Sequence, residues 1–306
     1  MRDEMGAVLV EQGNIDSTLV VLDADLSTST RTSLFREAFP GRFFNIGIAE
    51  QNMVGIATGL ALAGKNVVVS GFSVFTLCRA WDFIRLAAHE QLPVKICTTH
   101  SGLSSGRDGS SHQTFEDLSL ACSIPNLNVV APADAGEARQ IMEYVLQTPA
   151  PFFVRLTRNP TPPVIPSDYQ YNFGVIQELS GGTEATLFAV GGMVEVALDA
   201  SKCLAEEGIN IQVMNASTIK PLDSRTIIKC ASTTGAICVL EEHNILTGLG
   251  VQISAVVGKE YPVPIEIIGI PDQFGQSGEE QELREYYGLT AKDVAERLKH
   301  LIYRRK

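Results

Sequence analysis

Hydrophobic residues along this chain gather in short β-favouring runs, and the stretches between them have helical spacing. Runs typical of buried strands lie at 18–22, 43–46, 66–70, 94–98, 128–131 and 152–156. Helices are predicted at 3–13, 31–39, 54–64, 76–89 and 135–146. Strands and helices that alternate in this way predict an α/β domain, in which a mostly parallel sheet is covered by helices on both faces.

Residues 158–174 break this alternation. They hold four prolines, at 160, 162, 163 and 166, and show no apolar period, so we interpret them as an interdomain linker. A second α/β pattern follows, with strands predicted at 185–190, 211–214, 236–240 and 265–268 and helices at 194–207, 224–231, 250–257, 279–287 and 291–302. We therefore predict two α/β domains, at 1–165 and 166–306.

Glu50 lies where the second predicted strand gives way to a helix rich in small residues. Gly55 and Gly59 fall on one face of that helix and are expected to let another backbone approach closely. Ligands bind at strand ends in open α/β sheets. A glutamate in the first turn of a helix is, however, more simply explained by the helix dipole. The other polar stretches therefore decide how Glu50 is interpreted.

The most polar stretch is the loop 99–113, which follows a strand and holds three glycines and two of the five histidines. Loops of this length in compact domains are usually functional or disordered. Glycines let the backbone approach a ligand closely. His100 and His112 could donate to a phosphate or shuttle protons. For either histidine alone, a structural role in the loop is as good an explanation.

Two further signals are weaker. Phe72 and Phe75 follow the third strand and could stack on a flat heterocycle, although buried aromatic residues are more often plain core. Arg158 ends the last strand of the first domain and could bind a phosphate through its planar fork, or form a surface salt bridge. Arg2 gives no signal by itself.

Composition narrows the functional classes. The 306 residues are 45% hydrophobic and 19% charged, which predicts folded domains, and the net charge of −11 argues against nucleic-acid binding. No apolar run is long enough to span a membrane, and the first residues lack the apolar core of a signal peptide. The six cysteines form no CxxC pair and are expected to be buried, reduced thiols of a cytoplasmic protein.

Several motifs with known chemistry are absent from the sequence. It contains no Walker A loop, no GxGxxG after a strand and no HExxH. Glu241, Glu242 and His243 suggest a metal site at first sight, but adjacent side chains diverge, and we interpret them as a solvated strand end. No metal ligand is therefore predicted in this chain.

Taken together, the motifs resemble the C-terminal half of a transketolase over nearly the whole chain. The motifs are Ala24-Asp25-Leu26, GIAEQN at 47–52, the Phe72 and Phe75 pair, the loop ending in GRDGSSHQ, Thr157-Arg158-Asn159 and the late stretch FGQSGEEQELREYYGL. The resemblance implies a pyrimidine-binding domain followed by a transketolase C-terminal domain, with thiamine diphosphate as cofactor. In that family a separate N-terminal domain with a GDG…N motif holds the diphosphate and its Mg²⁺ or Ca²⁺, and no such motif is seen here.

The resemblance also implies roles for individual residues. Glu50 matches the glutamate that bonds to N1′ of the aminopyrimidine, and His112 matches the histidine that faces the reacting carbon and the donor hydroxyl. Phe75, with Phe72 beside it, matches the aromatic wall of the cofactor site. The remaining matches are Asp25 at the cofactor, Asp108 at a substrate hydroxyl, and Arg2, Ser29, His100 and Arg158 at the substrate phosphate. The sequence departs from the usual family residues at Cys78, Arg107, Ser110 and Ser111, which leaves substrate preference open.

The expected function is that of one subunit of a split transketolase. It would move a two-carbon ketol unit from a ketose phosphate to an aldose phosphate, together with an N-terminal subunit in an α2β2 heterotetramer. Neither nucleic acid nor a membrane is expected as a partner. The alternatives are a deoxyxylulose-phosphate-synthase-like enzyme, the β subunit of a 2-oxoacid dehydrogenase and a non-catalytic partner subunit. The set of Glu50, His112 and Arg158 argues against the last of these.

Overall fold

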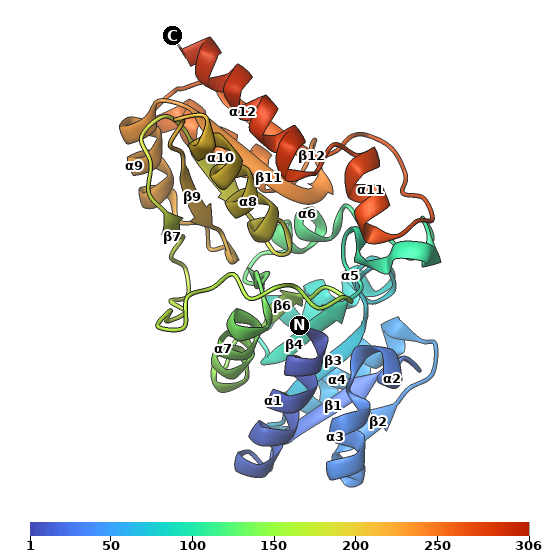
Figure 1. The fold of residues 1–306 in the computed structure, drawn as a ribbon. Helices are drawn as coiled ribbons and strands as arrows, with labels where there is room; N and C mark the ends of the chain where they lie inside the picture. The colour runs from blue at the N-terminus through green and yellow to red at the C-terminus, as the bar shows by residue number, and fades with distance from the viewer. Residues whose placement is uncertain (306) are drawn as a thin grey trace.

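The computed structural model describes residues 1–305 and has two α/β halves (Figure 1). The first half is built on a seven-stranded sheet in the order β10-β5-β6-β4-β3-β1-β2. Its strands are parallel except β10, which pairs antiparallel with β5 at one edge. The strands are β1 (Leu19–Asp23), β2 (Phe43–Asn45), β3 (Asn66–Phe72), β4 (Val94–Thr99), β5 (Asn128–Val130), β6 (Phe152–Arg155) and β10 (Thr218–Lys220).

Helices cover both faces of the first sheet, which explains why its strands are apolar along their length. Val20 and Leu22 of β1 pack in the core that α4 and α5 help to form, whereas Leu19 and Val21 pack with α1 and α7. Figure 1 shows α1 and α7 side by side in front of the sheet. The helices are α1 (Arg2–Ile15), α2 (Ser27–Thr30), α3 (Ser33–Ala38), α4 (Glu50–Leu62), α5 (Ser73–His89), α6 (Asp117–Cys122) and α7 (Ala135–Gln147), with 3₁₀ turns η1 (Pro40–Arg42) and η2 (Leu103–Asp108).

The second half repeats the layered arrangement on a smaller scale. Its five strands have the order β12-β11-β8-β9-β7, and all pairs are parallel except β7 with β9. The elements are β7 (Gln177–Ser180), β8 (Thr186–Ala189), α8 (Met193–Glu206), β9 (Gln212–Asn215), α9 (Ser224–Thr234), β11 (Ile237–Asn244), α10 (Leu249–Glu260), β12 (Ile265–Ile270), α11 (Glu280–Tyr286) and α12 (Ala291–Arg305). The predicted fold class of two mostly parallel α/β units is thus confirmed.

The two halves are joined by more than the linker. One hydrophobic cluster runs from α4 and α5 into the second half, where it includes Phe188 and Val239. The buried carboxylate of Glu137 on α7 accepts hydrogen bonds from the Asn215 amide at 2.8 Å and from the Tyr169 hydroxyl of the linker. Strand β10, which comes from the second half of the sequence, extends the first sheet. The halves therefore pack as one body.

Several local predictions were wrong. Strands β7 and β10 were missed because they are short and carry no apolar alternation. Glu241 and His243 do not lie at a solvated strand end, because both are fully buried, and Glu241 accepts hydrogen bonds from the first amides of α10. Gly59 does not meet a second backbone, since a Cβ there would find open space.

Two predictions that concern the cellular setting have mixed outcomes. All six cysteines are free, but Cys78 and Cys203 are exposed rather than buried. Among residues 1–305, no helix is long and apolar enough to cross a membrane. The cytoplasmic location stays a prediction.

Candidate active site

The side chains that the sequence singled out gather at one edge of the first sheet. Since its central strands are parallel, their carboxyl ends all reach this edge, where open α/β sheets bind ligands. In Figure 1 the N-terminus of α1, which carries Arg2, lies at the junction of the two halves. Each of these residues ends or follows a strand: Asp25 and Ser29 follow β1, Glu50 follows β2, Phe72 and Phe75 lie at the end of β3 and just after it, His100 and His112 follow β4, and Arg158 follows β6.

Two aromatic rings and two imidazoles form a compact cluster at this edge. The rings of Phe72 and His100 stack with centroids 3.7 Å apart, and the rings of Phe72 and Phe75 stack at 6.0 Å. His112 meets Phe75 edge-on at 5.1 Å. Phe72 and His100 are buried, whereas Phe75 and His112 remain partly exposed. The cluster therefore has a buried base and an accessible outer surface, formed by Phe75 and His112.

Glu50 lies next to this outer surface. It is the first residue of α4 and is only 4% exposed. Its Oε1 accepts a hydrogen bond from Nη1 of Arg79 at 3.0 Å, and Cζ of the same arginine lies 4.5 Å from the centroid of the Phe75 ring. A hollow of ≈ 510 Å³ opens beside Glu50 and is lined in part by Ile48, Asn52 and Arg79. Glu50 and Phe75 thus share one neighbour, Arg79.

The sequence interpretation missed Arg79, although the sequence contains a signal for it. Arg79 follows Phe75 by four residues on α5, and residues at this spacing are neighbours on a helix surface. An arginine over an aromatic ring is attracted by the negative face of that ring. The pairing with Phe75 could therefore have been predicted, but the contact with Glu50 depends on how α4 packs against α5.

The loop after β4 takes the conformation that its glycines make possible. Gly102, Gly106 and Gly109 all have positive φ. Position 102 requires glycine for two reasons: its φ is positive, and a Cβ there would lie 2.5 Å from Oε2 of Glu242. The Ser105 hydroxyl lies 2.8 Å from the carbonyl oxygen of His100 and 2.9 Å from that of His112. The loop therefore holds the two histidines close together.

A positively charged corner adjoins the cluster. Arg2 donates to the carbonyl oxygen of Ser29 at 2.6 Å, and Arg158 donates to Oδ2 of Asp108 at 3.1 Å. Burial lowers the pKa of Arg2, and the charge of Arg31 lowers it further. Cations that crowd together at a strand end favour the binding of an anion.

His100 belongs to this corner as a neutral ring. Burial lowers the pKa of His100 to about 3, and the charges of Arg2, Arg158 and His112 act in the same direction. Its Nδ1 lies 2.8 Å from the hydroxyl of Thr99. At neutral pH the imidazole can donate a hydrogen bond but carries no charge. The charge available to an anion here comes from the arginines.

The two aspartates after β1 have different surroundings. Asp25 is exposed, has φ 65, and exchanges hydrogen bonds with Asn45, whose Nδ2 lies 3.0 Å from Oδ1 of Asp25. Asp23 is fully buried and accepts hydrogen bonds from the hydroxyls of Thr30 and Thr32. Asp23 therefore shapes the turn, which leaves Asp25 facing solvent.

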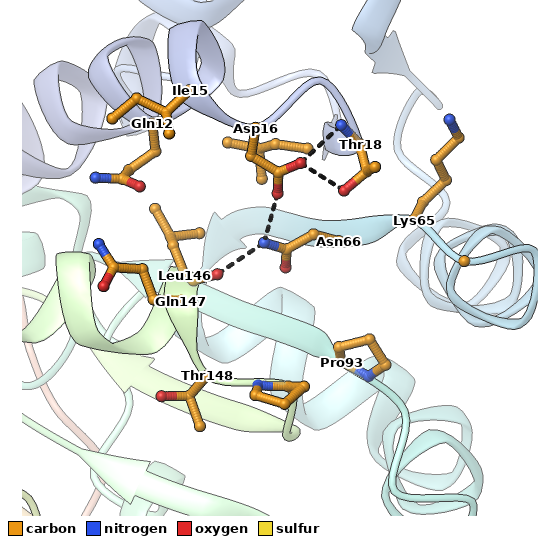
Figure 2. Close-up of a pocket in the computed structure, with 13 residues that line it drawn as sticks. Gln12, Ile15, Asp16, Thr18, Lys65, Asn66, Pro93, Leu146, Gln147 and Thr148 are labelled. Atoms are coloured by element: carbon orange, nitrogen blue, oxygen red, sulfur yellow. Dashed lines mark hydrogen bonds between the residues drawn. The ribbon is translucent and has the colours of Figure 1, made fainter.

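A second hollow lies at the opposite edge of the same sheet. It has a volume of ≈ 450 Å³ and is lined by residues such as Gln12, Asp16 and Lys65 (Figure 2). Figure 2 shows Asn66 between Asp16 and Leu146, to which its amide donates at 3.2 and 2.8 Å. This hollow is at the amino ends of the strands and contains none of the residues predicted for the site, so the candidate active site is the one at the carboxyl edge.

Two family models match this chain. The model of the transketolase pyrimidine binding domain matches residues 1–163, and that of the transketolase C-terminal domain matches residues 174–294. The chain belongs to the transketolase family. The two models leave a short stretch between them, and the domain boundary at 165/166 stays a prediction.

Proteins similar to this chain include a split gene transketolase and two transketolase subunits. A solved structure described as a split gene transketolase in an inactive beta4 tetramer shares 40% identity, covers 100% of this chain and 98% of its own, and has a TM-score of 0.90. A 6-deoxy-6-sulfo-D-fructose transketolase subunit of Clostridium sp. is 34% identical over 100% of this chain and 95% of its own. An apulose-4-phosphate transketolase subunit of Phocaeicola vulgatus is 34% identical over 94% of this chain and 92% of its own.

Transketolase family membership implies dependence on thiamine diphosphate, and the chain fits one end of that cofactor. Glu50 is a buried carboxylate suited to a basic ring nitrogen, and Phe75 is a partly exposed aromatic ring suited to a flat one, although Arg79 contacts both in this structure. The fit does not extend to the metal ion. Among residues 1–305, no group of three or more His, Cys, Asp or Glu side chains could hold one.

Proposed function

We propose that this chain is the C-terminal subunit of a split transketolase, which moves a two-carbon ketol unit from a ketose phosphate to an aldose phosphate. The observation that carries this proposal is the placement of Glu50 and Phe75 around one shared neighbour, Arg79, with His112 at the edge of the Phe75 ring. A carboxylate, an aromatic face and an imidazole are thereby directed to one place. The nearby arginines supply charge for a phosphate.

In this proposal each residue has a defined task. When bound, thiamine diphosphate supplies the carbon nucleophile and the electron sink for the two-carbon unit. Glu50 holds a proton at N1′ of the aminopyrimidine, and burial strengthens this hydrogen bond. Phe75, with Phe72 beneath it, carries the ring. His112 hydrogen-bonds to substrate oxygens near the reacting carbon, and Asp25 helps to shape the cofactor site.

The substrate would be held at the positively charged corner. Arg2, Ser29, His100 and Arg158 bind its phosphate, and Asp108 binds a hydroxyl group of the sugar. Arg158 and Asp108 pair with each other in this structure, so both would exchange that contact for the substrate. Such a pair, more than one-third exposed on both sides, is weak enough to be exchanged.

The proposal also requires a partner. The diphosphate and its Mg²⁺ or Ca²⁺ would be held by an N-terminal transketolase subunit, in an α2β2 heterotetramer. Two relatives that align over 92% and 95% of their own length are named as subunits, whereas two transketolase-like proteins of about twice the length align over only 48% to 49% of theirs. The related structure described as an inactive beta4 tetramer further supports the need for a second kind of subunit.

Reconstitution tests the proposal. The purified chain alone is expected to show no ketol transfer, and activity should appear when the N-terminal subunit, thiamine diphosphate and a divalent ion are added. The measurement is the conversion of a ketose phosphate and an aldose phosphate, followed by mass spectrometry. Robust transfer by the chain alone would contradict the need for a partner, and an inactive complete mixture would contradict the reaction.

The names of the relatives favour a second possibility for the substrate. The Clostridium protein is named for a sulfonated sugar, whose anionic group could also be bound by Arg2 and Arg158. A reaction of the deoxyxylulose-phosphate synthase type is the other alternative, since such a synthase aligns with 94% of this chain at 36% identity. Supplying phosphorylated sugars, sulfonated sugars, or pyruvate with glyceraldehyde phosphate to the assembled enzyme would discriminate the three.

Replacing Arg158 by alanine is expected to raise KM for phosphorylated aldoses by about ten- to a hundredfold, because a charge-assisted hydrogen bond is worth roughly 1.5–3 kcal/mol. The change in kcat should be smaller, since the phosphate is bound alike in ground and transition states. Steady-state kinetics with a phosphorylated acceptor and with glycolaldehyde measure the contrast. Arg297→Ala, which removes a surface arginine paired with Glu266, serves as control. Equal losses with both acceptors would show that Arg158 has a structural role.

A further inference from the structure

Arg79 makes two contacts at once that no role described above requires. Its guanidinium donates to Oε1 of Glu50 at 3.0 Å and lies 4.5 Å from the centroid of Phe75. The two partners come from different helices, α4 and α5. A guanidinium is planar and cationic and has N–H groups at its edge. It can therefore bond to a carboxylate through its edge while its face lies on an aromatic ring.

These two contacts are those that the proposed function assigns to the aminopyrimidine of the cofactor. A protonated aminopyrimidine is likewise flat and cationic, with an N–H donor at its edge. We propose that Arg79 is a stand-in for this ring, which pairs with Glu50 and covers Phe75 until the cofactor arrives and is then displaced. This inference rests on the proposed function, because it assumes that Glu50 and Phe75 receive the cofactor.

Burial on the two sides of the ion pair differs, and this makes displacement of the arginine feasible. The side chain of Arg79 is 50% exposed, whereas that of Glu50 is 5% exposed. Arg79 can swing into water at small cost to its own solvation, because half of its side chain is already exposed. Glu50 cannot, and a buried carboxylate that loses its partner is destabilising. A stand-in thus stabilises the chain before assembly and leaves readily afterwards.

If Arg79 acts as a stand-in, Arg79 and the cofactor compete for Glu50 and Phe75. When a site is open for only a fraction of the time, its apparent affinity for a ligand is the intrinsic affinity multiplied by that fraction. Removing the arginine should therefore tighten cofactor binding. A residue that helped to hold the cofactor would have the opposite effect, and so the direction of the change decides between the two roles.

The first test measures the pair in the chain alone. Arg79→Met, Glu50→Gln and the double variant are compared by urea unfolding in a double-mutant cycle. We expect Arg79→Met to destabilise the chain and to do so less when Glu50 is already glutamine, with a coupling of about three- to tenfold in the unfolding equilibrium. Arg85→Met on the same helix, which pairs with Asp82 at 3.8 Å, is the control and should show no coupling to Glu50. Additive effects would overturn the stand-in.

The second test titrates thiamine diphosphate into the assembled enzyme by calorimetry. We expect Arg79→Met to lower Kd by about three- to tenfold, because the competing pair is gone. Arg79→Lys keeps the charge without the planar fork and should give an intermediate Kd, while Arg85→Met should match the parent. An unchanged or raised Kd in Arg79→Met would overturn the stand-in while leaving the proposed function intact. If the parent itself binds no thiamine diphosphate, the proposed function fails and the stand-in with it.

Discussion

Glu50→Gln is expected to lower the rate of ketol transfer by about a thousandfold in the assembled enzyme, within the range of 10²–10⁴ typical of a positioned acid or base. Glutamine has the size of glutamate and can still form a hydrogen bond. It has no negative charge, however, and so cannot stabilise a proton on N1′ of the aminopyrimidine. Glu50 is buried at the start of α4, so bulk water cannot take over the stabilisation that the lost carboxylate gave to this proton.

The measurement is the exchange of the C2 proton of bound thiamine diphosphate, followed by NMR in deuterated buffer. Exchange should slow by a factor similar to that of the overall rate, while the assembly and its secondary structure persist. Glu37→Gln, on the exposed surface of α3, makes the same chemical change away from the site and should leave exchange unaltered. Unchanged exchange in Glu50→Gln would exclude the role at N1′ and leave the helix dipole as the reason for the residue.

The sequence was sufficient to predict the two-domain α/β fold, because buried parallel strands leave long apolar runs that helices separate. It was insufficient at the edges of the sheets. Strand β10 has only three residues and lies in the short connection between β9 and α9, so nothing local distinguishes it from a loop. Its place beside β5 follows from how the two halves pack. The misreading of Glu241 as a solvated strand end has a similar origin, since its burial and the hydrogen bonds that it accepts from backbone amides of α10 depend on how β11 and α10 pack.

The site was predictable to a different degree for different residues. The positions of Phe72, His100 and Arg158 follow from strand ends, because parallel strands direct their carboxyl ends to one edge. The stacking of Phe72 on His100 could not be predicted, since it requires the two strands to be adjacent and the loop to turn at Gly102. The neutral state of His100 was equally hidden, because it results from burial and from arginines distant in sequence.

His112→Ala is expected to lower kcat by about a hundredfold or more, because a side chain that transfers or holds a proton in the transition state contributes at least that much. The imidazole lies edge-on to Phe75 at 5.1 Å and is half-buried, so it can reach a substrate over that ring. The affinity for thiamine diphosphate should change little. Steady-state kinetics for the donor sugar, together with calorimetry for the cofactor, separate these two effects.

A structural role for His112 predicts a different outcome. The histidine is tied into its loop through its backbone, since its carbonyl oxygen lies 2.9 Å from the Ser105 hydroxyl and its N–H donates to the Gly109 carbonyl at 3.0 Å. Alanine retains both contacts and loses the exposed hydrogen bond between Nδ1 and the Ser111 hydroxyl at 2.9 Å, so thermal stability should fall only slightly. His112→Asn, which restores a hydrogen-bond donor but cannot transfer a proton, should recover donor KM more than kcat. A variant that melts at a lower temperature but keeps its kcat would instead assign His112 to the loop, and proton transfer would then need another group.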